Sequence, residues 1–410
     1  MSPPEASGGA AVSAAARPDA IRRHNLALIL GQVHRHGALT RADLTARLGV
    51  SRSTVGALVS DLTQLGLVEE SVPTGGDRVG RPSHVVGPHS TGPVVVGVDV
   101  DITHITSAAV GIGGTVLARR HQPTGPEPTS PEAVADLVVE SVRGLLQDSA
   151  RLVVGVGVSV PGTVDKRTGT VGVAPNLQWR DAPFGDLLTE RLGPGLTVAV
   201  GNDADLSVLA ELSRGNARGC DDVVYLIGRI GVGAGAVVNG APLHGRDGRA
   251  GEIGHNVVDP NGPECHCGKR GCLETIIGDA ALLGLAGRDV PPTEANVARL
   301  FRDARSGDAA ALGSIRTAAG WLGQALGNLA NTLNPQRVIL GGSLSGILEL
   351  ARPEIERALE HYAFDPGHPV ELMLPRFGVD SALLGAAELA LAVLLDDPSS
   401  VTTLTTLQPR

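Results

Sequence analysis

The chain has 410 residues, a length that corresponds to two or three domains with enough polypeptide for a large buried core. Hydrophobic residues make up 42% of the chain and charged residues 19%, a globular balance that excludes a mostly disordered protein. The net charge of −9 is uneven: residues 1–86 carry nine arginines against seven acidic residues, whereas the remainder has a net charge of −11. This asymmetry favours two functions, one of which faces phosphate.

Neither a secreted nor a membrane protein is indicated. The first eighteen residues are rich in Ala, Pro, Ser and Gly and lack the basic and apolar regions of a secretory signal, so residues 1–19 are expected to be a disordered tail. Apolar runs such as residues 152–160 fall short of the roughly 20 residues that span a bilayer. We therefore expect a soluble, cytoplasmic protein with no membrane partner.

Three short helices are expected between residues 20 and 66. Apolar residues at helical spacing form the first, which ends at Gly37. Thr40, with Asp43 three residues later, has the pattern of a capping box and begins the second helix. Ser51 is the expected N-cap of the third helix. Two helices joined by a tight glycine-containing turn are typical of the helix-turn-helix motif.

In that motif the second helix places its N-terminal residues in the major groove of DNA. The expected DNA contacts are therefore Ser51, Arg52, Ser53 and Thr54, together with Arg78 and Arg81 near the tip of a β-hairpin wing. A small helical bundle for protein contacts is the alternative. The sequence ALTRADLTARLGVSRSTVGALVSDLTQLGLVEES, followed by GRPS, resembles winged-helix bacterial repressor domains. This resemblance implies that residues 20–88 bind operator DNA.

From Val94 onward, strands alternate with helices, which indicates a twisted α/β sheet. Two such sets, the second beginning near Val198, predict two lobes with a ligand cleft between them. The expected boundaries are 94–200 plus 376–397 for the first lobe, 201–375 for the second, and 398–410 for a C-terminal tail. An apolar stripe predicts a helix over 314–333 that packs either in the core or at a dimer interface, and the core is favoured.

Three of the four cysteines lie within eight residues. Cys265, Cys267 and Cys272 have the spacing C-x-C-x4-C, and His255 lies ten residues upstream. A Cys3His set forms a closed tetrahedral site whose soft thiolates and imidazole suit Zn²⁺. A disulfide is the alternative, but Cys265 and Cys267 are too close to pair easily and a cytoplasmic chain disfavours bridges. One structural zinc ion per chain is expected.

The segment GRAGEIGHNVVDPNGPECHCGKRGCLETIIG contains E-x-G-H and C-x-C-G-x-x-G-C-x-E signatures. With these motifs the chain resembles the ROK family, named for repressors, open reading frames and kinases. The resemblance extends over about residues 20–395 and includes GVSVPGTVD, PNLQW, GNDADLSVLAEL, GVGAG and NPQRVILGGSLS. It implies a multidomain protein in which a mainly α winged helix-turn-helix precedes a two-lobed α/β fold of the actin-like, sugar-kinase (ribonuclease-H-like) class.

The resemblance also implies a sugar site. The matching side chains are Asn202, Asp203, Glu252, His255 and Glu274, with the backbone near Gly162 and with Asn176. Carboxylates and amides suit this ligand because each can form paired hydrogen bonds with sugar hydroxyls. The resemblance further implies that His255 binds zinc through one ring nitrogen and faces the sugar with the other.

Kinase activity requires a catalytic base and a loop that holds the phosphates of ATP. Asp203 matches the catalytic aspartate of the family's kinases, but Asp101 and Ile102 replace both glycines of their D-x-G-G-T loop. β-branched Ile102 resists the backbone geometry of such loops, and Asp101 introduces a repulsive carboxylate that no new cation is expected to offset. The second phosphate loop is kept in part, with Arg229 in place of a small residue. ATP and Mg²⁺ are therefore not expected as cofactors.

Two functions remain open from the sequence. The favoured one is a sugar-responsive transcriptional regulator, a repressor rather than an enzyme, whose degenerate kinase domain senses a carbohydrate. The alternative is an active, glucokinase-like ATP-dependent sugar kinase fused to a DNA-binding domain. A zinc sensor is weaker, because a closed Cys3His site holds its metal as structure. The expected partners are operator DNA, a sugar or sugar derivative, and further copies of the chain in a homodimer or a dimer of dimers.

Overall fold

A computed structural model describes residues 18–72, 84–125, 130–148, 151–246, 248–365 and 367–402. The chain forms two compact units. One comprises Met1–Ser90 and Val393–Thr403, and the other Thr91–Ala392 and Leu404–Arg410. We call them the N-terminal unit and the α/β unit, and each is described by itself.

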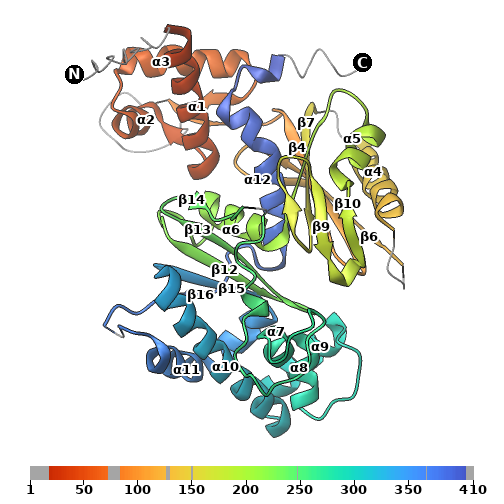
Figure 1. Cartoon of the computed structure of the whole chain (residues 1–410). Coiled ribbons are helices and arrows are strands. Elements are labelled where there is room, and N and C mark those ends of the chain that lie inside the picture. The colour runs from red at the N-terminus through yellow and green to blue at the C-terminus, as the bar shows by residue number, and fades with distance from the viewer. Residues whose placement is uncertain are drawn as a thin grey trace, which may run out of the picture. The chain divides into compact units, whose positions relative to one another are not determined.

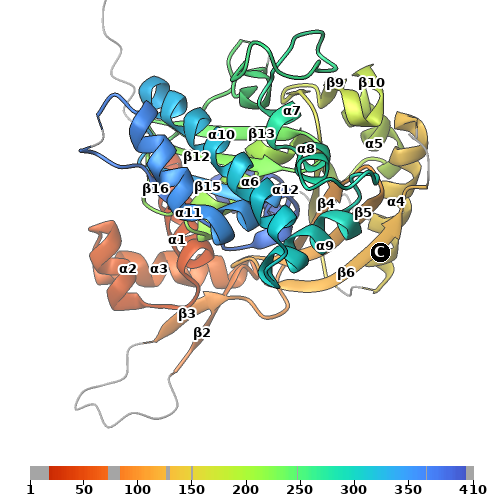
Figure 2. The ribbon, with the colours of Figure 1, turned by 90° about the horizontal axis from the view of Figure 1, so that it is seen from below.

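The N-terminal unit is a winged helix. Its helices are α1 (Pro18–His36), α2 (Arg41–Leu48) and α3 (Arg52–Gln64). They pack around an apolar core and a three-stranded antiparallel sheet of order β1-β3-β2 (Figure 2). The strands are β1 (Leu39–Thr40), β2 (Val68–Ser71) and β3 (Val85–Pro88). The fully buried core side chains include Ile29, Leu30, Val33, Leu44, Val55, Val59 and Leu62. The predicted helix-turn-helix with a β-sheet wing is confirmed.

Local sequence signals set the helix boundaries in this unit. The Thr40 side chain accepts a hydrogen bond from the Asp43 backbone, and Asp43 accepts one from the Thr40 backbone, which confirms the capping box. Gly49 ends α2 with φ at 65°, a left-handed conformation that glycine adopts without strain. Ser51 caps α3 by accepting a hydrogen bond from the backbone of Thr54. The turn between α2 and α3 is therefore bounded by the C-cap at Gly49 and the N-cap at Ser51.

Some predicted features lie outside the described residues. They are the wing-tip arginines Arg78 and Arg81 and most of the expected N-terminal tail. Helix α1 begins at Pro18, two residues inside the segment expected to be a tail.

The first lobe of the α/β unit is built on a five-stranded sheet of order β11-β7-β4-β5-β6. Its strands are β4 (Val94–Val100), β5 (His104–Gly111), β6 (Val116–Pro123), β7 (Val153–Val160) and β11 (Thr197–Asn202). Helices α4 (Pro131–Asp148) and α5 (Phe184–Leu192) share an apolar core with this sheet (Figure 1). Strands β4, β7 and β11 run parallel, so their carboxyl ends meet at one edge.

A small antiparallel sheet, of order β10-β9-β8, follows β7 in the chain. Its strands are β8 (Val164–Asp165), β9 (Thr170–Ala174) and β10 (Trp179–Ala182). The 3-10 helix η1 (Pro175–Leu177) joins β9 to β10.

The second lobe has a five-stranded sheet of order β14-β13-β12-β15-β16. Its strands are β12 (Val223–Gly228), β13 (Val232–Val238), β14 (Ala241–Pro242), β15 (Arg337–Gly342) and β16 (Glu371–Met373). Because side chains alternate along β12, Val224 and Leu226 join the core formed with α10 (Ala309–Leu333) and α11 (Ser343–Tyr362). Tyr225 and Ile227 point to the opposite face, where α6 (Asp203–Arg214) packs (Figure 1).

Helix α10 corresponds to the helix that the apolar stripe predicts over residues 314–333. The helix begins five residues earlier, and its Ile315, Leu322, Leu326 and Leu329 are buried in the core of the second lobe. Trp321 is only partly buried and packs at the edge of that core.

Helix α12 (Ser381–Asp396) packs directly against the backbone of the first sheet. A Cβ atom at Gly97 would lie 2.6 Å from the carbonyl oxygen of Leu383, and one at Gly157 would lie 1.9 Å from that of Ala386. Two glycines therefore permit this close approach. The segment Gly378–Asp396, with a mean hydropathy of 1.8, is long and apolar enough to cross a membrane, but 61% of it is buried inside the fold. This segment is longer than residues 152–160, the apolar run considered above from the sequence alone.

Candidate functional site

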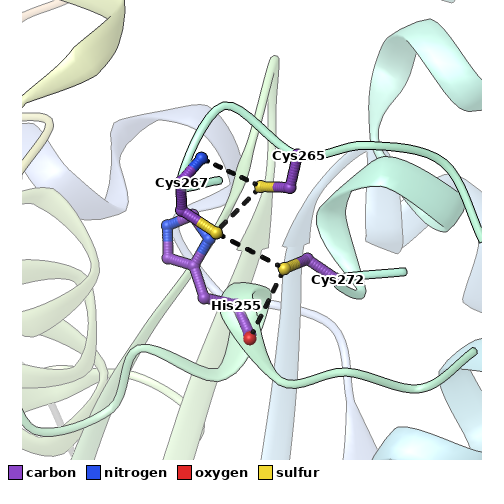
Figure 3. Close-up of side chains that lie close together, drawn as sticks. All are labelled: His255, Cys265, Cys267 and Cys272. Atoms are coloured by element: carbon purple, nitrogen blue, oxygen red, sulfur yellow. Dashed lines mark hydrogen bonds between the residues drawn. The ribbon is translucent and has the colours of Figure 1, made fainter. Parts of the chain in front are cut away.

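The predicted metal ligands come together in one loop of the second lobe. Their ligand atoms all lie within 4.8 Å of one another, and the set is His255, Cys265, Cys267 and Cys272 (Figure 3). The Sγ atom of Cys265 is 3.7 Å from Nδ1 of His255, and the Sγ atoms of Cys267 and Cys272 are 3.6 Å apart. All four cysteines of the chain are free thiols, so the disulfide alternative is not supported.

These separations suit a tetrahedral ion. Ligands held at about 2.0–2.3 Å from one tetrahedral centre lie roughly 3.3–3.8 Å from each other. The loop reaches this shape by folding back on itself, with isolated bridges between Val257 and Cys272 and between Glu264 and Arg270. Gly271 is required at the crossing: its φ is 68°, and a Cβ atom there would lie 1.5 Å from the Asp259 carbonyl oxygen. The donor set and its geometry fit Zn²⁺.

A second, overlapping set of possible ligands shares two residues with the first. It consists of His255, Cys265, His266 and Glu274. The Glu274 carboxylate accepts a hydrogen bond from the Cys265 thiol at 3.1 Å and lies 3.2 Å from Nδ1 of His266. Glu274, expected to contact sugar, thus lies directly beside the metal loop. The sequence analysis missed His266, although its position between two predicted ligands was a signal.

Asn202, Asp203 and Gly162 form a second group where β11 meets α6. The Asn202 amide donates to the Gly162 carbonyl oxygen at 2.9 Å and to the Asp203 carboxylate at 3.0 Å. The Asn202 oxygen also caps α6 by accepting from Ala204 and Asp205. Gly162 has a φ of 122° and packs against residues 173–174, so a side chain there would clash. Asn176, which the sequence also suggested as a sugar contact, lies half-buried in η1, two residues after Ala174.

The turn from Arg229 to Gly231, between β12 and β13, lies between these two groups. A Cβ atom at Gly231 would lie 2.9 Å from a Glu274 carboxylate oxygen. On the other side, Arg229 lies among the carboxylates that end β4 and begin α6. The structure therefore brings Glu274 and Asp203 to the same turn, near the carboxyl ends of β4, β11 and β12, where α/β folds place their ligands.

Arg229 corrects one expectation from the sequence. Its Nη1 donates to Oδ2 of Asp101 at 2.8 Å, and its Nη2 lies 3.5 Å from Oδ2 of Asp99. The expectation that no cation offsets Asp101 was therefore wrong. Arg229 and Asp101 are 128 positions apart in the chain, and only the fold brings the end of β12 to the end of β4. Ile102 adopts no positive φ and packs against the core of the first lobe.

Burial changes the acidity of several site carboxylates. Burial raises the pKa of Asp203 to about 6, although the guanidinium of Arg229 acts in the opposite direction. Burial also raises the pKa of Asp279 to about 6 and raises that of Glu252, where Glu274 adds to the effect and His255 opposes it. At Arg229, burial disfavours the charge, but the carboxylates around it outweigh that cost and raise its pKa.

The predicted DNA contacts of α3 are exposed. Ser51, Arg52, Ser53 and Thr54 all lie on the surface at the start of the helix. The hydroxyl of Ser51 is 2.8 Å from the hydroxyls of both Ser53 and Thr54, which fixes these short side chains around the helix N-terminus. A bidentate ion pair connects β2 to α2: Arg41 donates to both carboxylate oxygens of Glu70, at 2.5 and 2.6 Å.

Comparison with known proteins decides the family. The family model described as ROK family matches residues 95–393, which is more than half of the chain. The chain belongs to the ROK family. A MarR family model matches residues 27–78, which include α2 and α3 of the winged helix. The ROK domain is therefore preceded by a DNA-binding module of the MarR type.

Proteins similar to this ROK protein include some named as repressors, which match nearly the whole chain, and some named as glucokinases, which match about 71% of it. It is 27% identical over 384 residues to a xylose repressor from Bacillus spizizenii, covering 92% of this chain and 97% of the relative. It is 32% identical to a glucokinase from Halalkalibacterium halodurans, covering 71% of this chain and 92% of the relative.

Solved structures divide in the same way. A ROK family glucokinase from Streptomyces griseus in complex with glucose and AMPPNP matches with a TM-score of 0.63 and 30% identity, covering 72% of this chain and 98% of that one. A ROK family transcriptional regulator, described as a homolog of the E. coli MLC protein, matches with a TM-score of 0.75. That match covers 94% of this chain and 98% of the other at 24% identity, which supports the fold of the whole chain.

Proposed function

We propose that this ROK protein is a sugar-responsive, DNA-binding transcriptional repressor whose α/β unit senses a carbohydrate. The observation that carries the proposal is the combination of two parts in one chain. One is a winged helix with exposed polar residues at the start of α3, and the other is a ROK domain in which Asp101 pairs with Arg229. The full-length similarity to xylose repressors supports the same assignment.

In this proposal, operator DNA is read by Ser51, Arg52, Ser53 and Thr54 at the start of α3, together with Arg78 and Arg81, which lie outside the described residues. Short hydroxyls and a guanidinium can donate to base edges and to phosphates. A homodimer would present two such helices at a fixed spacing, so a small change in their separation would break register with the two half-sites.

The sugar is held by Asn202, Asp203, Glu252, His255 and Glu274, with backbone near Gly162. The metal loop holds one Zn²⁺ through His255 and the three cysteines. With one ring nitrogen on the metal, His255 would present the other toward the ligand in one orientation, beside Glu274. If sugar weakens DNA binding, DNA must weaken sugar binding by the same factor.

The kinase alternative is favoured by Asp203, which matches the family's catalytic aspartate, and by the similarity to glucokinases. Against it stands the first phosphate loop. A phosphate bound there would face the carboxylate of Asp101, and Arg229 is already engaged by that carboxylate.

The experiment uses the full-length protein. Duplexes that it binds are selected from a random DNA library, and the selected duplex is then challenged with a panel of free sugars. We expect one enriched sequence and its release by at least one sugar. An ATP-coupled assay over the same panel is expected to show no turnover. Robust phosphorylation of any sugar, with no enriched duplex, would reverse the assignment in favour of the kinase.

A further inference from the structure

Four carboxylates surround one guanidinium at the point where the two lobes meet. The carboxylates are Asp99, Asp101, Asp203 and Asp279, and Arg229 is the guanidinium. Asp99 ends β4, Asp101 follows that strand, and Asp203 begins α6. We call this set the cleft cluster.

The Arg229 guanidinium is engaged on two sides. Its Nη1 donates to Asp101 at 2.8 Å, and its Nη2 lies 3.5 Å from Asp99. Both acceptor carboxylates are held in place by further hydrogen bonds. Asp99 accepts a hydrogen bond from Ser159 at 2.8 Å, and the other oxygen of Asp101 accepts from the backbone of Ile102 at 2.7 Å.

Arg229 cannot leave this position without a cost. The Asp99 side chain is only 9% exposed, and a buried carboxylate that loses its cation is strongly destabilising. An incoming anion would therefore have to compete for Arg229 with two carboxylates that are already held in place.

The balance of charge in the cluster is negative. With Asp99 and Asp101 ionised, Arg229 neutralises only one of them, and ionisation of Asp203 or Asp279 adds further negative charge. Burial makes that ionisation costly, as the pKa of about 6 for both groups indicates. A phosphate dianion placed here would meet repulsion in a poorly screened environment. A hydroxyl carries no charge and can donate to any of the carboxylates.

We propose that the cleft cluster makes this domain selective for uncharged sugars, so that it rejects sugars phosphorylated on the hydroxyl that faces Asp203. This inference rests on the proposed sensor function and names its ligand class. Asp101 is the residue that sets the selectivity, because it both occupies Arg229 and supplies a repulsive charge.

The test compares matched pairs of ligands on the full-length protein by titration calorimetry. The probes are D-xylose with D-xylose 5-phosphate, D-glucose with D-glucose 6-phosphate, and further aldoses and ketoses with their terminal phosphate esters. For the sugar that binds, the free form is expected to bind at least about tenfold more tightly than its ester, which corresponds to about 1.4 kcal/mol.

Two variants separate the cleft cluster from general charge effects. Asp101→Asn removes one charge without changing shape and leaves Arg229 paired with Asp99 as its only charged hydrogen-bond partner among the described residues, so the affinity ratio should move toward the phosphate ester by about tenfold. Asp380→Asn is the control: it removes an aspartate charge outside the cleft cluster, from the ion pair with Arg119. The affinity ratio of this variant should equal that of the wild type. Circular dichroism of both variants checks that they fold.

The outcomes are distinguishable. An ester that binds the wild type as tightly as the free sugar overturns the selectivity and leaves the sensor function intact. An unchanged ratio in a folded Asp101→Asn protein overturns the role of the cleft cluster. Binding of neither form by any pair overturns both this inference and the proposed function.

Discussion

Arg214 and Glu388 form an almost fully buried ion pair between the end of α6 and the middle of α12. Nε and Nη2 of Arg214 both donate to one Glu388 oxygen, at 2.9 and 2.7 Å, while the other oxygen accepts from Ser213 at 2.9 Å. The two side chains are 12% and 4% exposed. Because α6 packs on the second sheet and α12 on the first, this pair joins the cores of the two lobes.

Replacing Glu388 should destabilise the α/β unit strongly. Glu388→Ala leaves Arg214 buried without its main partner, and removal of one member of a buried pair costs about 3–5 kcal/mol. Urea unfolding of the full-length protein measures the loss. Asp380→Ala is the control, because it breaks an exposed pair, with Arg119, worth about 0–1 kcal/mol. Equal losses in the two variants would contradict a special role for the buried pair.

Arg52→Ala should reduce specific DNA binding. Loss of a bidentate contact to a base costs about 1–3 kcal/mol, or roughly a 5- to 150-fold loss of affinity for the selected duplex. Arg52 is exposed at the start of α3, so neither folding nor sugar affinity should change. Fluorescence anisotropy and calorimetry measure the two affinities, with Arg299→Ala on the exposed face of α9 (Glu294–Arg305) as the control. Equal loss of both affinities would show that Arg52 is structural.

Cys267→Ser should remove the metal. Cys267 is the exposed member of the ligand set, so its replacement disturbs packing least and mainly removes one thiolate. The zinc content after dialysis against a chelator should fall from about one per chain to near zero, with loss of the sugar response. Cys220→Ser, which changes a thiol outside the set, should retain the metal. A zinc-free Cys267→Ser protein that still responds to sugar would refute the role given to His255.

Asp203→Asn should alter the dependence of stability on pH. Since the folded state holds the Asp203 proton up to a pKa of about 6, against an ordinary 3.8, the wild type loses stability as the pH rises through this window. The loss amounts to about 2–3 kcal/mol by pH 7.5, at about 1.4 kcal/mol per pKa unit. Asparagine stays neutral, so the stability of the wild type relative to the variant should fall between pH 4.5 and pH 7.5.

Urea unfolding at pH 4.5, 6 and 7.5 provides the measurement. Asp279→Asn is a matched variant, because burial raises that carboxyl's pKa to the same value, and it should show the same trend. Parallel stability profiles for the wild type and Asp203→Asn would show that Asp203 titrates in its ordinary range.

The sequence predicted those parts of the structure that local chemistry determines. The Thr40 capping box and the cap at Ser51 depend on residues three positions apart. The metal loop was also predictable, because Cys265, Cys267 and Cys272 are brought together by one short turn of chain.

Contacts between distant segments were not predictable in this way. Asp101 and Arg229 each stood out as departures from the kinase pattern, but their pairing depends on how two sheets are placed against each other. The ion pair between Arg214 and Glu388 spans 174 positions for the same reason. The close packing of α12 gave only an indirect signal, in glycines such as Gly97 that occupy the middle of a strand.

The N-terminal unit contains Met1–Ser90 and also Val393–Thr403, so the polypeptide leaves it once and later returns to it. The boundary at Val393 falls within helix α12 (Ser381–Asp396). The N-terminal unit is therefore not one contiguous stretch of sequence. A fragment that ends at Ser90 would lack Val393–Thr403, which belong to the same compact unit.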